Sequence, residues 1–195
     1  MNTVFKYTFL LVVTMLGSIY PSIIIAQTQV QGAVEGTWSG NVEVIGNLWV
    51  EEGKSLTIQE GTQIVFSGPY IMNVWGSVVA NGTATSPINF TVADTSGFAD
   101  SSTLVGSWQG IVYSHVLSTS DSSIYNWVNF KYTKDLRDNG ETSSGGAFTI
   151  TGFPKRRRSN CHFFNTKSWT AGGAIAMTSG ADVKIEKCLF ENSVL

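Results

Sequence analysis

Two motifs near the carboxyl end of the chain recur at one fixed spacing, and this repetition limits the fold more than any other feature. Residues 145–150 (GGAFTI) return as residues 172–177 (GGAIAM), and residues 160–165 (NCHFFN) return as residues 187–192 (KCLFEN). Both motifs are displaced by the same offset, so a whole turn of chain repeats rather than a single motif. A fixed period between about 20 and 50 residues is typical of a solenoid, in which each repeat buries its apolar side against its neighbours.

Short alternation of apolar and polar residues indicates that the repeats consist of strands. Val183 and Ile185, for example, stand among charged residues, and no segment shows the long period of 3.6 that helical repeats need. At about 3.3 Å per residue, one repeat supplies an outline of roughly 90 Å, enough for three short strands joined by bends. Parallel stacking at about 4.8 Å would make residues one repeat apart direct neighbours.

This stacking predicts specific neighbours and specific bends. The glycine pairs at 145–146 and 172–173 should mark a bend where a side chain would obstruct the chain. The asparagines should form a ladder at another bend, with a structural role. The expected neighbours are Cys161 and Cys188, Phe163 and Phe190, and Asn165 and Asn192.

This arrangement resembles the right-handed parallel β-helix, the pectin-lyase-like architecture. The paired glycine and Cys-x-Phe motifs are similar to repeats of polymorphic outer-membrane proteins, although those place Asn three residues after Phe, whereas Asn165 and Asn192 follow at two. Residues 46–66 and 74–91 resemble the opening coils of secreted β-helix proteins. The resemblance implies an all-β fold, a single-stranded right-handed parallel β-helix over residues 37–195, with residues 27–36 as a flexible lead-in.

Apolar alternation in the first half of the chain suggests coils of unequal size. Ala93 to Leu104 is rich in Ser, Thr, Asp and Gly and should form a loop. After residue 192 the next coil would begin, which leaves an open strand edge, so we expect a fragment of a longer protein. Two early matches guide the expected alignment: Val44, Gly46, Leu48 and Val50 with Val74, Gly76, Val78 and Ala80, and Ile64 and Phe66 with Ile88 and Phe90.

Residues 1–26 have the pattern of a secretory signal peptide. Lys6 gives a positive start, an apolar run follows, and Ala26 offers a small residue for cleavage. As a helix the apolar run would span about 28 Å, so an uncleaved membrane anchor is the alternative. Interruption by Gly17 and Pro21 favours cleavage, which would leave no stable membrane span. We therefore expect a secreted or cell-surface, outer-membrane-associated protein.

Composition and export also bear on partners and on the cysteines. The chain has 12 Lys and Arg in total, and removal of the leader with Lys6 leaves 11 basic residues against 14 acidic ones. This slightly acidic balance does not predict binding to nucleic acid. Export would place the two cysteines in an oxidising compartment, where a disulfide is possible. In-register neighbours on parallel strands point the same way, however, which favours a ladder of buried thiols over a disulfide.

Aromatic and basic residues are the candidate contacts for a polysaccharide or a cell-surface glycan. Trp49, Trp75 and Trp127 each adjoin a core position, so alternation turns them outward, where they could stack on sugar rings or be covered by loops. The basic run comprises Lys155, Arg156, Arg157 and Arg158.

Two arginines of the basic run fall, after a shift by one repeat, on the core positions of Val183 and Ile185. Burying an unpaired guanidinium would cost several kcal/mol, so we expect the segment to twist outward or Pro154 to end the strand. The resulting cluster is similar to the cationic residues that neutralise uronate carboxylates in polysaccharide lyases. A solvated, distorted strand is the alternative.

A loop expected to bulge between Thr133 and Ser144 holds Asp135, Asp138, Asn139 and Glu141. These oxygen ligands are weak candidates for Ca²⁺, and an acidic turn without metal is the alternative. No other cofactor is expected.

No catalytic set can be assembled around the two histidines, His115 and His162, and the Asn-Thr-Asp, Asp-Asp and Gly-His-Gly series of polygalacturonases is missing from the sequence. We therefore expect an exported, non-catalytic scaffold for surface adhesion or glycan contact. The alternative is a polysaccharide lyase or glycoside hydrolase of pectin-lyase-like fold with active residues partly outside this chain.

Overall fold

The computed structural model describes residues 27–114, 116–117, 120–136, 145–152, 155–177 and 180–195, and in residues 155–157 the backbone alone. The expected leader and most of the acidic loop lie outside these residues. The described part is all-β, with strands and no helix. The strands are β1 (Gln27–Ala33), β2 (Gly36–Trp38), β3 (Asn41–Val50), β4 (Ser55–Ile58), β5 (Gln63–Phe66), β6 (Met72–Val74), β7 (Ser77–Asn81), β8 (Ile88–Val92), β9 (Ile111–Tyr113), β10 (Ser123–Asn126), β11 (Val128–Asp135), β12 (Phe148–Ile150), β13 (Lys155–Ser159), β14 (His162–Ser168), β15 (Ile175–Met177), β16 (Asp182–Glu186) and β17 (Leu189–Val194).

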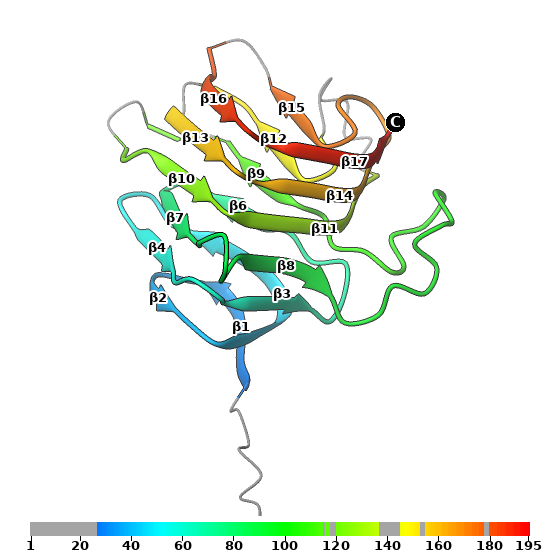
Figure 1. Ribbon diagram of the computed structural model, residues 1–195, viewed down its shortest axis with the longest axis horizontal. Helices are drawn as coiled ribbons and strands as arrows, with labels where there is room; N and C mark the ends of the chain where they lie inside the picture. The colour runs from blue at the N-terminus through cyan, green and yellow to red at the C-terminus, as the bar shows by residue number, and fades with distance from the viewer. Residues whose placement is uncertain (1–26, 115, 118–119, 137–144, 153–154, 178–179) are drawn as a thin grey trace, which may run out of the picture.

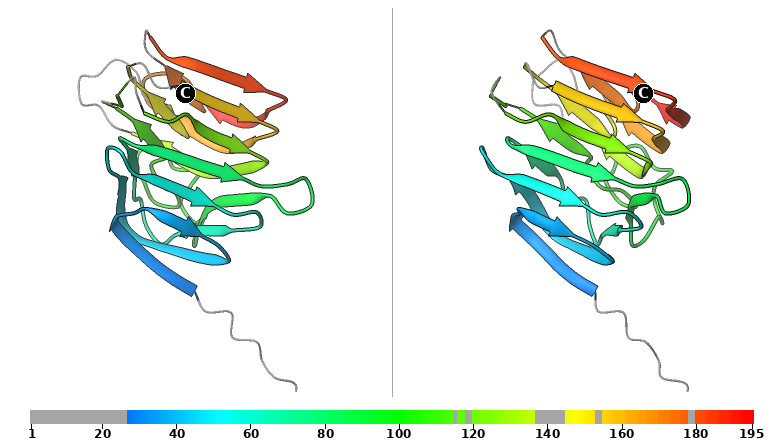
Figure 2. Two further views of the ribbon diagram at one scale, coloured as in Figure 1. Left: turned by 90° about the vertical axis from the view of Figure 1, so that its left-hand side faces the viewer. Right: turned by 60° about the vertical axis from the view of Figure 1, so that its left-hand side comes forward.

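The pairings among these strands are all parallel, and from β4 onward each strand pairs with the one three places further along the chain. The result is an 11-stranded sheet and a six-stranded sheet. The long strand β3 joins two arms of the larger sheet, because its first half pairs with β5 and its second half with β6. The strands rise in tiers from β1 to β17 (Figures 1 and 2). These parallel sheets are compatible with a parallel β-helix.

The register expected from the repeats is confirmed in the last tiers. Phe163 pairs with Phe190 in parallel strands β14 and β17, and Phe148 pairs with Ile175 in β12 and β15. The Asn192 amide donates to the Oδ1 of Asn165 at 3.1 Å. The asparagine ladder is therefore present at the predicted place.

Inward-facing side chains stack into a continuous apolar core. The rings of Phe90, Phe130 and Phe163 follow one another with centroids 5.2 Å apart at each step, and Phe190 continues the column at 4.7 Å. Trp108 is fully buried and stacks on Phe66 at 4.3 Å. Burial of each such ring stabilises the fold by about 1.5–3 kcal/mol, and each favourable ring pair adds about 0.5–1.5 kcal/mol.

Backbone bends depend on residues that tolerate unusual conformations or that carry no side chain. Asn165 and Asn192 both have positive φ, 53° and 52°, at equivalent bends within β14 and β17. A Cβ on Gly146 would lie 2.2 Å from the carbonyl oxygen of Gly173, and a Cβ on Gly145 only 2.0 Å from that of Phe148. The predicted glycine bend is therefore confirmed, because no side chain fits there.

Two expectations for the first half of the chain were wrong. Residues 27–33 are no flexible lead-in but form strand β1, whose Val30 stacks in register on Val44 of β3. The two expected early alignments also fail, since Val44 pairs with Phe66 rather than with Val74, and Ile64 pairs with Phe90 rather than with Ile88. The bends differ in length, so apolar spacing alone does not fix the register. Strand β11 runs on to Asp135, and residues 137–144 of the bulge expected between Thr133 and Ser144 lie outside the described residues.

Candidate functional site

The loop between β8 and β9 is organised by a buried lysine of β11. The Nζ of Lys134 donates to four backbone carbonyl oxygens of this loop, and the side chain is fully buried. Those carbonyls belong to Gly97, Asp100, Thr103 and Val105, at 3.1, 2.7, 3.0 and 3.0 Å. Burial, together with the nearby charge of Lys167, lowers the pKa of Lys134, and the Asp100 carboxylate opposes that shift. A group of carbonyl oxygens suits an ammonium, which has three protons to donate, so two of the four carbonyls share one proton.

A second lysine, from β14, closes the same loop. The Nζ of Lys167 donates to the carbonyls of Phe98 and Ala99, both at 3.1 Å. Both ammonium groups also face the Phe98 ring, Lys134 at 5.0 Å and Lys167 at 4.9 Å from its centroid. The expected loop at residues 93–104 is thus confirmed. Nothing in the sequence pairs it with these lysines, which come much later in the chain.

A pocket of about 320 Å³ opens between this loop and the turn after β5. Phe66 and Val92 are buried at its base, and Val105, 59% exposed, forms part of its rim. Asp94 contributes a carboxylate to the lining. This volume lies at the small end of the range for ligand pockets, about 300–1,000 Å³.

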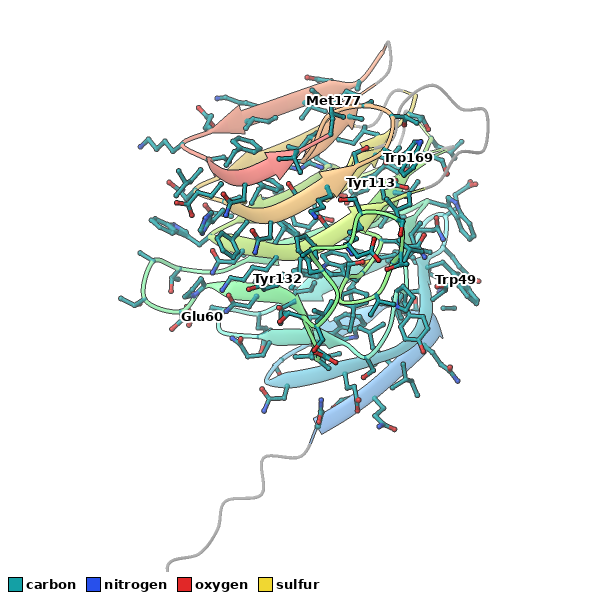
Figure 3. All side chains as sticks on the ribbon, turned by 90° about the vertical axis from the view of Figure 1, so that its right-hand side faces the viewer. Trp49, Glu60, Tyr113, Tyr132, Trp169 and Met177 are labelled. Atoms are coloured by element: carbon teal, nitrogen blue, oxygen red, sulfur yellow. The ribbon has the colours of Figure 1, made fainter. Side chains whose placement is uncertain are left out.

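The three candidate tryptophans do not gather in one place. Trp49 pairs with Asn73 in neighbouring strands, and Trp75 follows two residues later on the same side, so these two lie close to each other. Figure 3 shows Trp49 at the margin of the molecule, where its half-buried indole lies close to Gly32 of β1. Trp75 and Trp127 are each 36% exposed, as alternation predicts. Trp127, however, lies at the bend between β10 and β11, where it has a φ of 52°.

The basic run does not leave the sheet as expected. Strand β13 includes it, and Arg158 pairs in register with Ile185. The Arg158 side chain is fully buried, with its guanidinium carbon 3.9 Å from the centroid of the Phe148 ring. The expectation that the segment twists outward is therefore wrong for Arg158, because a cation–π contact replaces water over one face of the guanidinium. The side chains of Arg156 and Arg157 lie outside the described residues.

Of the calcium candidates, Asp138, Asn139 and Glu141 lie outside the described residues. Asp135 is fully buried at the end of β11 and accepts a hydrogen bond from the Thr149 hydroxyl at 3.4 Å. In the part of the chain that the structure describes, no group of three His, Cys, Asp or Glu side chains could hold a metal ion.

The cysteines are neighbours with free thiols, as the ladder interpretation requires. Cys161 is buried and Cys188 half-buried, and their thiols donate to backbone carbonyls, Cys161 to that of Ser159 and Cys188 to that of Glu186, both at 3.4 Å. The neighbouring thiol of Cys161 lowers the pKa of Cys188 to about 6, while Cys188 and burial raise the pKa of Cys161. His162 lies on the outer side of β14 and contacts the Glu191 carboxylate at 2.6 Å.

Comparison with known proteins returned no matching family model, no matching curated protein and no matching solved structure. The class that the fold defines is an all-β protein built of parallel sheets. Among the described residues no helix is long and apolar enough to cross a membrane.

Proposed function

We propose that this chain is an exported, right-handed parallel β-helix of the pectin-lyase-like type, and that it is a non-catalytic scaffold for glycan contact at a cell surface. From β4 onward each strand pairs with the strand three places later in the sequence, and this regular pairing supports the β-helix architecture. The leader pattern of residues 1–26 supports export.

The observation that carries glycan contact is the placement of Trp49 and Trp75 on one outer side. Trp49 lies in β3 and pairs with the half-buried Asn73 of β6, and Trp75 directly follows that strand. An exposed indole face can stack on a sugar ring, and an adjacent amide can exchange hydrogen bonds with hydroxyls. Trp127 is a second contact point at a different bend, and Arg156 and Arg157 are further candidates. Arg158 is enclosed in the core and takes no part.

A glycan array probed with the mature protein tests this proposal. We expect binding that falls at least several-fold in Trp75→Ala and Trp49→Ala, because each change removes one stacking face. Trp169→Ala is the matched control, since it removes an exposed tryptophan that takes no part in the proposed surface. An array without bound glycans, or equal losses in all three variants, would refute a binding surface at Trp49 and Trp75.

Incubation with pectate, alginate and glycosaminoglycans in the presence of Ca²⁺ tests the non-catalytic part of the proposal. We expect no unsaturated and no newly formed reducing ends. Turnover of any of these polymers would replace the scaffold proposal with a polysaccharide lyase or glycoside hydrolase.

A further inference from the structure

One wall of the pocket is formed by the loop between β8 and β9, called here the lysine-held loop (residues 93–110). This wall is rigid because the loop packs tightly against itself. Gly106 has a φ of 76°, and a Cβ there would lie 2.5 Å from the Ser96 carbonyl oxygen. Ser107 is buried, and its hydroxyl donates to the Leu104 carbonyl at 2.7 Å. The hydrogen bonds from the buried Lys134 ammonium to four loop carbonyls also hold this wall in place. Such a pocket is preformed and needs no closure to receive a ligand.

The chemistry of the lining is amphiphilic. Leu104 and Val105 give an aliphatic wall, and Pro69 lies opposite on the turn after β5. Asp94 is held by Ser96, whose backbone N–H and hydroxyl donate to Oδ1 at 2.8 and 2.5 Å. These hydrogen bonds keep the pKa of Asp94 below its ordinary value. Among the described residues no donor occupies Oδ2, which is left to accept from a ligand.

A second carboxylate stands behind the pocket. The hydroxyl of Ser67, which lines it, donates to Oε1 of Glu43 at 2.5 Å, and Gln29 donates to Oε2 of the same carboxylate at 2.8 Å. The positive charges of the two loop lysines are meanwhile directed at loop carbonyls. The pocket therefore presents negative charge beside an aliphatic surface, which favours a neutral or cationic ligand and disfavours an anion.

We propose that this pocket is a subsite for one ring of a neutral or amino sugar and that it rejects uronates. The C–H face of a sugar packs on Leu104 and Val105, while Asp94 accepts hydrogen bonds from ring hydroxyls or from an ammonium group. The inference rests on the proposed glycan contact and names the sugar class for it. It adds a site distinct from the tryptophan surface.

Titration of the isotope-labelled mature protein by NMR tests this proposal with three probes: methyl β-glucoside, methyl β-glucosaminide and galacturonate. We expect the two non-acidic sugars to shift the backbone amides of Gly68, Asp94 and Ser107, with the glucosaminide binding most tightly. Galacturonate should leave those amides unmoved. Shifts confined to other regions, or galacturonate binding as well as the glucoside, would overturn the proposal.

Two variants and one control sharpen the test. Val105→Trp fills the pocket from an exposed rim position and should abolish the shifts. Asp94→Asn should weaken the glucosaminide roughly ten-fold and the glucoside less, as expected for the loss of a charge-assisted hydrogen bond. Met177→Ala, at an exposed position outside the pocket lining, should leave all three titrations unchanged. Unaltered binding in Val105→Trp would overturn the pocket as the site.

The two proposals can fail separately. Monosaccharide shifts at the pocket combined with a blank glycan array would sustain the subsite and refute the tryptophan surface. Array binding that depends on Trp75, without shifts at the pocket, would support the tryptophan surface and refute the subsite.

Discussion

The ring of Phe163 lies flat against the ring of Phe190, with centroids 4.7 Å apart and planes inclined by 5°. The two residues are one repeat apart and pair in parallel strands. Phe163 is fully buried because it has neighbours on both sides, whereas Phe190 is 44% exposed at the end of the column. This difference makes the stack testable residue by residue.

Phe163→Ala should lower the free energy of unfolding by about 3–5 kcal/mol, since it leaves a cavity between two stacked rings. Phe190→Ala is the matched control and should cost clearly less, because part of its ring already contacts water. Urea unfolding followed by tryptophan fluorescence measures both values. Equal costs would show that Phe190 is as fully covered as Phe163.

Lys134→Met should destabilise the loop between β8 and β9. The methionine keeps the apolar stem but leaves four part-buried carbonyl oxygens without their shared donor, at a cost of roughly 3 kcal/mol. Limited proteolysis should cut the variant within residues 94–107 faster than the wild-type chain. Lys131→Met, on the same strand but outside the group of carbonyl oxygens, is the control and should leave the loop resistant. Resistance in Lys134→Met would refute the role of the ammonium.

Acid should loosen the same loop through Asp100. Hydrogen bonds from the Ser102 hydroxyl and N–H to Oδ1, at 2.7 and 2.8 Å, hold the pKa of Asp100 below its ordinary value. Because the folded pKa is the lower one, the stabilising contribution is present above the ordinary pKa of an aspartate and is lost as pH falls through the folded pKa. Hydrogen exchange of the Ser102 amide, corrected for intrinsic rates, should accelerate over that range. Asp100→Asn should remove this pH dependence, and Asp121→Asn should preserve it.

Cys188 should react with iodoacetamide well before Cys161. Its pKa of about 6 makes it largely thiolate at pH 7.5, whereas Cys161 is buried with a raised pKa. Mass spectrometry at short times should therefore show one adduct, on Cys188. Cys161→Ser should alter the pH profile of the reaction, and Cys188→Ser should abolish the fast phase. Two adducts at equal rates would contradict the thiol pair.

Much of the fold could be predicted from the sequence where successive repeats have the same length. The constant offset between the two copies placed Phe163 on Phe190 and Asn165 beside Asn192. The first tiers could not be aligned this way, because the lengths of their bends vary. Phe90, for example, pairs with Phe130, at a sequence offset much longer than that of the two repeats. Strand β1 could not be predicted because its sequence is mostly polar: Val30 is the one large apolar residue that it places over a core position of β3.

The candidate sites were harder to predict than the fold. The alternation of apolar and polar residues correctly predicted that Trp75 and Trp127 are exposed, but it did not predict that they lie at different bends. Arg158 was expected to avoid the core, yet the aromatic face of Phe148 supports its guanidinium there. The lysine-held loop and its pocket depend on contacts between segments far apart in sequence, such as Lys134 with Gly97. No local pattern encodes such contacts.

The parallel, in-register stacking on which the account depends can be measured through one hydrogen bond. The backbone N–H of Leu189 donates to the carbonyl of Cys161 at 2.9 Å. A long-range HNCO spectrum of the deuterated protein should show a scalar coupling across this bond, from the carbonyl carbon of Cys161 to the amide nitrogen of Leu189. Coupling of the Leu189 amide to any carbonyl other than that of Cys161 would contradict the register that the repeats predict.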